Sequence, residues 1–362
     1  MNTCCGRGIW PRSAARSRPT RRGGSPVSTE FLDAAGAVEG SGIDAGVAAH
    51  YGNPLVEQRD LAVGKAVVDL SHRGVITVTG PDRLTWLDSV ASQRVSGMAP
   101  GDSAEMLLLG QTGRIEHVIR VIDDGVAAWL LIEGSETESL AQWLDSMRFM
   151  LRVEVDDRSA DFATLGMFGA PLVDAAAPNG VPLVWRDPWS AVATGGYQYA
   201  TTERHPAAEW RYLELLVERL RLGEASGLPR AGMLALEALR IAAWRPRFST
   251  EVDEKTIPHE LDLLRSAVHL TKGCYRGQET VAKVHNLGHP PRRLVLLHLD
   301  GSEGVLPGSG DVVQFEDKVV GRVTSAAQHF ELGPIALAVV KRMTDPDAVL
   351  TVHVGDAVVT AS

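Results

Sequence analysis

The residues best suited to chemistry stand together in the segment Lys272–Glu279, which reads KGCYRGQE. It holds Cys274, the only cysteine beyond the first five residues. Two glycines bracket this residue and predict a tight turn with exposed backbone. Lys272 and Arg276 lie two residues to either side, and because nearby cations stabilise a thiolate, the loop predicts a reactive thiol. The alternative is a buried structural cysteine that packs like a small hydrophobic residue.

A histidine pair, His285 and His289, follows this loop. The i, i+4 spacing suits a metal ion only when the segment is helical. Gly288 and Pro290 argue against a helix here, and no third ligand stands at a recognisable spacing. We therefore expect no metal site.

Two further groups of charged residues have open interpretations. The segment Asp253–Glu260 (DEKTIPHE) is polar, and its acids suit general acid–base catalysis or simply a solvated turn. Glu237 and Arg240 lie three residues apart on a predicted helix, where they can pair with each other. The guanidinium of Arg240 could equally hold a ligand carboxylate. The sequence contains no phosphate-binding P-loop, no Gly-x-Ser-x-Gly elbow and no dinucleotide fingerprint after a strand.

The elements that must position these residues follow from local patterns. Apolar and β-branched runs predict strands at 67–69, 74–78, 106–109, 115–122, 126–132 and 162–168. Helical spacing predicts helices at 82–90, 136–149, 209–222 and 234–243. Because tight turns join neighbouring strands between the helices, we expect an α+β fold with antiparallel sheets.

The predicted secondary structure changes near Gly288–Pro291, from mixed helices and strands to short strands alone. Short predicted strands follow at 294–299, 311–315, 318–324, 335–340 and 349–354. Such a run predicts a small all-β module of about 70 residues, plausibly a barrel. We therefore divide the chain into a disordered tail and linker (1–49), a main body (50–287) and a C-terminal β-barrel (288–362).

Composition limits the class of protein. The chain has 362 residues, of which 44% are hydrophobic and 22% charged, and this is typical of a soluble globular protein with two domains. No run of 18 apolar residues is present, so a membrane-spanning helix is excluded. Three cysteines, two of them near the N-terminus, make no disulfide framework, which favours a reducing, cytoplasmic location.

Charge is unevenly distributed. Residues 1–26 hold six arginines and no acid, so they carry +6 and, since the whole chain carries −9, the other 336 residues carry −15. A body this acidic repels phosphate backbones, and we expect no nucleic-acid partner. The basic tail fits a dispensable segment, translated upstream sequence or an organelle transit peptide.

Taken together, these segments resemble the glycine-cleavage T-protein (aminomethyltransferase) superfamily, and specifically its YgfZ-type folate-binding branch. Lys272–Glu279 matches the signature Lys-Gly-Cys-Tyr-x-Gly-Gln-Glu of that branch. Weaker matches to the superfamily occur at 69–72, 80–83, 113–115, 227–240 and 253–260. The resemblance covers roughly residues 50–360.

The resemblance implies a three-lobed, ring-like α+β fold around a central tetrahydrofolate pocket, completed by a small C-terminal β-barrel. It implies a role in the assembly, insertion or repair of iron–sulfur clusters, with folate and iron–sulfur client proteins as partners and no membrane. The catalytic residues that it implies are Cys274, Lys272, Tyr275, Arg276, Gln278 and Glu279. The folate-binding residues that it implies are Arg240, Glu237 and His117.

Several positions depart from the aminomethyltransferase pattern. His117, preceded by Glu116, stands where those enzymes have an Asp that polarises the reaction centre. The pteridine-contacting Thr-Gly-Glu-x-Gly segment has no clear counterpart, because Thr194–Tyr197 lacks the glutamate. Ala242 replaces a common Glu, and Trp244 a common Gly. We therefore do not expect an active glycine-cleavage T-protein.

Three hypotheses follow. The first is a tetrahydrofolate-binding iron–sulfur factor in which Cys274 is the reactive or sulfur-ligating thiol and Arg240 holds a folate carboxylate. The alternative is a folate-dependent one-carbon (aminomethyl) transferase in which Glu116 or His117 replaces the missing acid. The third is a non-enzymatic folate-binding scaffold in which Cys274 is structural.

Overall fold

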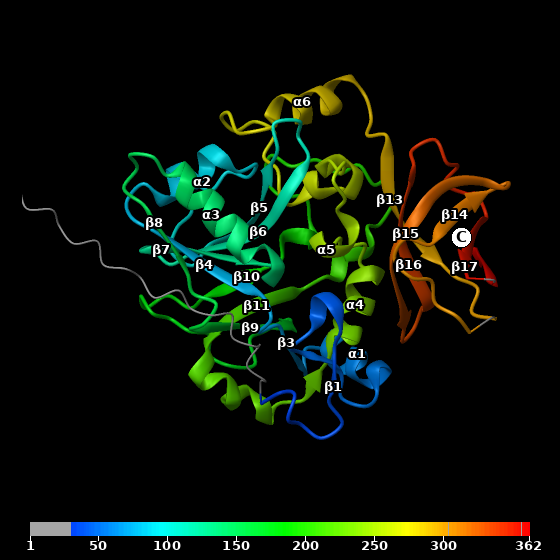
Figure 1. Ribbon diagram of the computed structural model, residues 1–362, viewed down its shortest axis with the longest axis horizontal. Helices are drawn as coiled ribbons and strands as arrows, with labels where there is room; N and C mark the ends of the chain where they lie inside the picture. Colours follow the sequence, from blue (N-terminus) through cyan, green and yellow to red (C-terminus); the bar gives the residue numbers. More distant parts are fainter. Residues whose placement is uncertain (1–29, 303, 356) are drawn as a thin grey trace, which may run out of the picture.

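The computed structural model describes residues 30–302, 304–355 and 357–362 (Figure 1). Our expectation for the arginine-rich residues 1–26 lies outside this part of the chain.

Residues 31–49 are not the linker that we expected. Strand β1 (Val38–Glu39) pairs with β2 (Ala48–His50) in a two-stranded antiparallel sheet. The small residues that suggested a linker instead permit close packing: a Cβ atom on Gly36 would lie 2.7 Å from the carbonyl oxygen of Tyr51, and one on Gly40 would lie 2.5 Å from that of Asp44. Ordered structure therefore begins before His50, and this segment belongs to the body.

One five-stranded antiparallel sheet carries the hairpin with His117. Its order is β5-β6-β7-β4-β8. The strands are β4 (Gly74–Thr79), β5 (Ser103–Leu109), β6 (Ile115–Asp123), β7 (Ala127–Ile132) and β8 (Glu154–Asp157). Helices α2 (Arg83–Val90) and α3 (Thr137–Met147) bury apolar side chains against it, among them Leu87 and Leu140.

A second five-stranded sheet, β10-β11-β9-β3-β12, is antiparallel except for the pair β12–β3. Its strands are β3 (Val67–Asp69), β9 (Phe162–Phe168), β10 (Val184–Arg186), β11 (Tyr212–Glu218) and β12 (Arg230–Ala231). Strand β11 corrects our prediction of a helix at 209–222. It lies between β9 and β10 with six consecutive buried residues, so its apolar run shows no alternation and matches helical spacing by chance.

Four more helices complete the body: α1 (Pro54–Ala62), α4 (Met233–Ala242), α5 (Phe248–Glu251) and α6 (Gln278–Leu287). Helix α6 corrects our view that the region of His285 is not helical; Gly288 ends the helix instead of preventing it. Within the described ranges, no helix has both the length and the apolarity needed to cross a membrane.

The C-terminal module is a six-stranded antiparallel sheet on one side of the body (Figure 1). Its order is β13-β16-β15-β14-β17-β18. The strands are β13 (Arg292–His298), β14 (Val312–Phe315), β15 (Lys318–His329), β16 (Gly333–Lys341), β17 (Leu350–Val354) and β18 (Ala357–Ala361). We expected a small barrel, and among the described residues the sheet is not fully closed. Its edges meet at one end, where His298 and Ser362 exchange two hydrogen bonds, Asp300 N–H donates to the carbonyl oxygen of Thr360 at 2.8 Å, and Leu299 forms a bridge with Ala361. The three-lobed ring stays a prediction.

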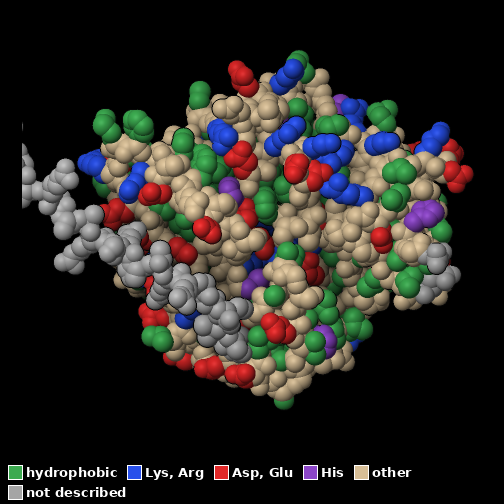
Figure 2. All heavy atoms as spheres, in the orientation of Figure 1, with side chains coloured by type: hydrophobic (Ala, Val, Ile, Leu, Met, Phe, Trp, Pro, Cys, Tyr) green, Lys and Arg blue, Asp and Glu red, His purple; other side chains and the backbone are tan. Residues whose placement is uncertain are grey.

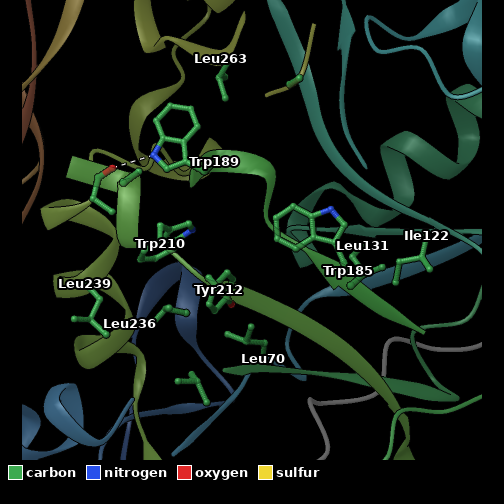
Figure 3. Packing of buried hydrophobic residues seen from close by; sticks show 14 of the residues in the cluster. Leu70, Ile122, Leu131, Trp185, Trp189, Trp210, Tyr212, Leu236, Leu239 and Leu263 are labelled. Atoms are coloured by element: carbon green, nitrogen blue, oxygen red, sulfur yellow. Dashed lines mark hydrogen bonds between the residues drawn. The ribbon is translucent and has the colours of Figure 1, made fainter. Parts of the chain in front are cut away.

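Large aromatic side chains fill the main core (Figure 3). Trp185 and Trp189 are fully buried, and each satisfies its indole N–H on a backbone carbonyl. Trp185 donates to Ala104 at 2.8 Å, and Trp189 donates to Ala243, just after α4, at 2.9 Å. The first bond joins β10 to β5, and the second joins the segment after β10 to the end of α4.

Candidate functional site

Lys272 fastens the signature loop to the end of α2. Its buried Nζ donates to the carbonyl oxygens of Asp88, of Ala91 at 2.7 Å and of Gln93 at 2.9 Å. The end of a helix leaves carbonyls without intrahelical partners, and the ammonium satisfies them here. Burial lowers the pKa of Lys272. These three contacts place the ammonium at the end of α2, and an effect of its charge on the thiol stays a prediction.

Cys274 is exposed, and it lies between two buried residues of the same loop, Lys272 and Tyr275. Tyr275, which follows it, is 7% exposed and belongs to the main core. The ring of Tyr275 lies 5.3 Å from the ammonium of Lys272, and burial raises the pKa of its phenol to about 12. The loop thus holds two buried anchors and presents the thiol outward. The buried packing role of a lone cysteine does not apply.

The loop docks on the turn between β5 and β6. Arg276 Nη1 contacts Glu116 Oε2, on β6, at 2.8 Å. Gly277 has a left-handed backbone (φ 81°), and a Cβ atom there would lie 2.6 Å from the carbonyl oxygen of Gly110. Two segments that the sequence singled out separately, the signature and the hairpin, are therefore in direct contact.

Gln278 and Glu279 begin helix α6. Gln278 Nε2 reaches the carbonyl oxygens of Lys272 at 3.4 Å and Gly273 at 3.5 Å, which closes the loop on itself. Glu279 is exposed in the first turn, where a helix favours negative charge. Neither side chain lies in a cavity wall among those that we describe.

His117 forms a close pair with a carboxyl group that the sequence did not reveal. Its Nδ1 lies 2.6 Å from Glu136 Oε1, and its ring stacks on Phe248 of α5 at a centroid distance of 6.5 Å. Burial raises the pKa of Glu136, although the hydrogen bond with His117 opposes this change. A carboxyl–imidazole pair of this kind can hold and move a proton.

Arg240 is committed to protein partners. It is 5% exposed, and its guanidinium makes a two-point contact with Glu237 at 2.6 and 2.8 Å. It also donates to Glu251 at 3.1 Å, to Ser325 of β15 at 2.7 Å, and, at 3.2 Å each, to the hydroxyl of Thr250 and the carbonyl oxygen of Arg245. The sequence left open whether Arg240 pairs with Glu237 or holds a ligand carboxylate, and in the structure it pairs with Glu237. A folate carboxylate would have to displace that glutamate.

Arg247 joins the same network from the loop before α5. It contacts Asp44 at 2.7 Å, Glu133 at 3.0 Å and Glu237 at 3.2 Å. Burial opposes ionisation of Asp44, but hydrogen bonds from His72 and Arg247 lower its pKa to about 2. The network therefore stays charged in the folded protein.

Glu214 is a fully buried carboxylate in the middle of β11. Its Oε1 accepts from Arg73 Nη1 and, at 3.0 Å, from the hydroxyl of Tyr212, and Arg120 Nε lies 3.7 Å away. Burial opposes ionisation, but Arg120 and Arg73 keep the pKa of Glu214 below its usual value. Glu214 Oε2 and the Nε atoms of Arg73 and Arg120 have no hydrogen-bond partner.

These charged side chains surround a cavity of about 30 Å³, which we call the central cavity. Its charged lining residues are Arg73, Arg120, Asp187, Glu214, Glu237, Arg240, Arg245 and Arg247. Figure 2 shows charged side chains deep in the hollow near the middle of one face.

The structure brings the predicted residues together in two groups. Cys274, Lys272, Tyr275 and Arg276 lie in the loop docked on the hairpin, whereas Arg240 and Glu237 lie in the central network. Sequence reasoning missed Glu214, although one signal was available: it is the single charge within the buried run 212–217, and a buried charge requires partners.

The acidic loop at 253–260 ties the body to the C-terminal sheet. Asp253 contacts Arg292 and Arg322, each at 2.8 Å, and Glu260 contacts Arg292 at 2.8 Å. The hydrogen bond from Arg292 holds the pKa of Asp253 well below its usual range. These acids are therefore structural and do not form a solvated turn.

Within the described ranges, no group of three or more histidine, cysteine or acidic side chains has an arrangement that could hold a metal ion. His285, which the sequence paired with His289, instead accepts or donates a 3.0 Å hydrogen bond with the hydroxyl of Tyr199.

Comparison with known proteins finds similarity to aminomethyltransferases. No family model matches the chain. It is 26% identical over 303 residues to an aminomethyltransferase of Symbiobacterium thermophilum, covering 76% of this chain and 78% of the relative. It is 28% identical over 313 residues to an aminomethyltransferase of Streptomyces coelicolor, covering 80% and 82%.

A solved structure shows the same fold. The glycine cleavage system aminomethyltransferase T of Bartonella henselae superposes with a TM-score of 0.71 at 18% identity, covering 92% of this chain and 94% of that one. The molecule is thus a mixed α/β protein with several antiparallel sheets and the aminomethyltransferase fold. The two sequence relatives described above are aminomethyltransferases, and a third relative, 25% identical over 336 residues (86% of this chain and 74% of the relative), is a putative chloroplastic transferase of Arabidopsis thaliana.

Proposed function

We propose that this protein is a YgfZ-type, tetrahydrofolate-binding factor for the assembly, insertion or repair of iron–sulfur clusters in client enzymes. The observation that carries the proposal is the loop of Cys274. Lys272 and Tyr275 are buried on either side of it, and Arg276 fastens it to the hairpin, while the thiol itself faces solvent. An outward thiol on a fixed loop suits contact with a cluster that belongs to another protein.

Folate binding is supported by the fold and by the polar atoms at the central cavity. A pteridine ring offers adjacent N–H donors and a carbonyl acceptor. The partnerless Glu214 Oε2 matches the donors, and the Nε atoms of Arg73 and Arg120 match the acceptor. Because the cavity measures only about 30 Å³, binding requires a side chain to move, and Arg120 is the most exposed of the three at 13%. Tetrahydrofolate, when bound, supplies ring nitrogens that carry one-carbon groups.

Ordinary aminomethyl transfer has weaker support at this site. His117 replaces the acid of the aminomethyltransferases, and its imidazole is paired with Glu136 at 2.6 Å. The negative charge at this position is therefore shared with a ring nitrogen and is not available as a free carboxylate beside a developing cation. The similarity to named aminomethyltransferases keeps this activity as the second candidate.

One substitution, at Cys274, separates the candidates, and a second, at Glu214, tests the folate site that both require. Cys274→Ser should retain folate affinity but fail to restore iron–sulfur enzyme activities in cells that lack the native gene. Glu214→Gln should weaken binding of 5-formyltetrahydrofolate at least tenfold in calorimetric titration. Replacement of Cys4 and Cys5 is the matched thiol control and should restore activity fully.

Two results would contradict the proposal. Full complementation by Cys274→Ser would reject a role for the thiol in iron–sulfur maintenance. Turnover of a lipoylated carrier protein with tetrahydrofolate, at a rate within tenfold of a genuine T-protein, would establish the aminomethyltransferase instead.

A further inference from the structure

A second and larger cavity lies where the body meets the C-terminal sheet, and we call it the junction cavity. It encloses about 340 Å³, within the range of small-molecule sites. Its walls come from the loop 199–205, from the segment 259–262 and from β13, together with Trp189 and Trp244. It shares no lining residue with the central cavity.

The backbone is strained at two positions in this wall. Trp244 (φ 55°) and Asp262 (φ 57°) both have left-handed backbones. Trp244 stands directly after the cap residue of α4, a position where glycine is usual and a bulky side chain is costly. In the described part of the chain, the other non-glycine residues with this conformation are Phe149, Glu316 and Asp317, none of which lines the cavity. Backbone strain of this kind concentrates at ligand-binding sites.

Four residues of the same wall carry buried polar atoms without partners. These atoms are Trp244 Nε1, His205 Nε2, His259 Nδ1 and Asp262 Oδ2. Buried polar groups in proteins are nearly always paired, so a cluster of four around one cavity indicates a missing partner. Since the cavity is large enough for an organic ring, that partner can be a ligand.

Hydrogen bonding on the far side of each imidazole assigns its role. His205 Nδ1 accepts from the N–H of Ala207 at 3.1 Å, so Nε2 carries the proton and is a donor. His259 Nε2 lies 3.1 Å from the carbonyl oxygen of Val281, so Nε2 carries the proton and Nδ1 is an acceptor. Burial lowers the pKa of both histidines to about 4, which agrees with neutral rings. With Trp244 and Asp262, the wall offers two donors and two acceptors.

Aromatic rings and cations complete the wall. The ring of His205 packs edge-on against Trp189 and against Trp244, in each case with a centroid distance of 5.7 Å. Arg293 and Arg342 also line the cavity, and the carboxylate of Glu260 there is neutralised by Arg292. Asp262 is the one other carboxylate among the lining residues, so Arg293 and Arg342 together leave an excess of positive charge, which favours an anion.

We propose that the junction cavity is a second ligand site, which binds a planar heteroaromatic ring that carries a carboxylate or phosphate group. Trp244 contacts the ring, and the fully buried Trp189 supports this wall from behind His205. The four polar atoms pair with the ring nitrogens and oxygens, and Arg342 attracts the anionic group. Two kinds of molecule share this chemistry, a nucleotide and a pteridine with a glutamate tail. The site does not depend on folate binding at the central cavity.

Calorimetric titration of the full-length protein at pH 7.5 tests the proposal with two probes, adenosine 5′-monophosphate and 5-formyltetrahydrofolate. Trp244→Phe keeps an aromatic ring, although a smaller one, and removes the N–H donor. Arg342→Ala removes an exposed cation, so it leaves the fold intact even where the tryptophan variant does not. We expect each variant to weaken binding of at least one probe fivefold or more. The matched control, Phe149→Gly, relieves the same backbone conformation at an exposed site and should leave affinity unchanged.

The variant Glu214→Gln separates this site from the central one. Binding of either probe that survives Glu214→Gln but falls in Arg342→Ala assigns the probe to the junction cavity and identifies its class. Failure of both probes to bind, or affinities that neither Trp244→Phe nor Arg342→Ala changes, would overturn the proposal. Folate binding lost only in Glu214→Gln would support the central site alone.

Discussion

Arg276 and Glu116 meet at 2.8 Å and so join the loop before α6 to strand β6. Both side chains are about one-third exposed, so the ion pair itself contributes at most about 1 kcal/mol to stability. Its importance is geometric. Cys274 lies two residues before Arg276 and His117 directly follows Glu116, so the thiol and the imidazole belong to one docked unit.

Gly277→Ala should undock this unit. The left-handed backbone costs a side chain about 1–2 kcal/mol, and the added Cβ would lie 2.6 Å from the carbonyl oxygen of Gly110. We expect a drop in unfolding free energy of at least this size in urea titration. Gly273→Ala is the matched control, because its Cβ would meet no atom within 4 Å. Equal stability of the two variants would show that the loop does not dock as described.

Lys272→Met should destabilise the protein, because three carbonyl groups lose a buried charged donor. A hydrogen bond to a charged group contributes about 1.5–3 kcal/mol, and we expect a loss in this range by urea titration. The control is Lys283→Met on the exposed face of α6, which should change nothing measurable. A Lys272→Met variant as stable as the wild type would show that these hydrogen bonds are not needed for stability. It would then favour the role that the sequence predicts for Lys272, activation of the Cys274 thiol.

Arg240→Ala should lower the unfolding free energy by about 3–5 kcal/mol, the range for removal of one partner from a buried ion pair. Arg240→Lys should restore only part of this loss, since an ammonium lacks the two-point fork that holds Glu237. Arg152→Ala, which breaks the exposed pair with Asp82, should leave the midpoint unchanged. A fully stable alanine variant with weakened folate binding would instead support direct contact with the ligand.

The junction cavity should make stability fall on acidification. The pKa of His205 and of His259 is lowered to about 4, so between pH 6.5 and 4 the unfolded chain binds two protons there that the folded protein does not. The pKa of Asp262 is raised to about 6, so in most of this window the folded protein holds one proton that the unfolded chain has released. The net excess is one proton in the unfolded state, and unfolding free energy therefore rises with pH.

Single variants isolate these contributions. In urea titrations at pH 5 and pH 7, the unfolding free energy of His259→Gln should fall less between pH 7 and pH 5 than that of the wild type. The unfolding free energy of Asp262→Asn should fall more than that of the wild type, because the variant lacks the carboxyl group that takes up a proton in the folded protein. Identical pH dependence in all three proteins would mean that these groups titrate normally.

Cys274 should react with iodoacetamide without denaturant, because its thiol is exposed. Cys4 and Cys5 must first be replaced, so that labelling reports one site. Mass spectrometry should show one adduct in the folded protein, and Cys274→Ser should show none. Labelling that begins only at denaturing urea concentrations would contradict the exposed position.

The sequence predicted elements whose signals are local. Strand β9 lies where its apolar run predicted it, and α4 ends close to its predicted limit before Pro246, because turn formers and β-branched runs act on near neighbours. The prediction of a helix at 209–222 was wrong because both faces of strand β11 are buried. That burial comes from pairing with β9 and β10, which the spacing of apolar residues does not reveal. The partners of Arg240 come from α4, α5 and β15, and no local pattern brings them together.

The contacts of α4 with the C-terminal sheet have a consequence for biosynthesis. Ile241 packs against Ile335 and Leu337 of β16, and Arg240 needs Ser325 of β15. A ribosome adds roughly 5–20 residues per second, so these partners emerge several seconds after α4. During that interval the nascent body exposes an apolar helix face beside an incompletely paired arginine. These contacts of the body therefore form only after β15 and β16 have been synthesised.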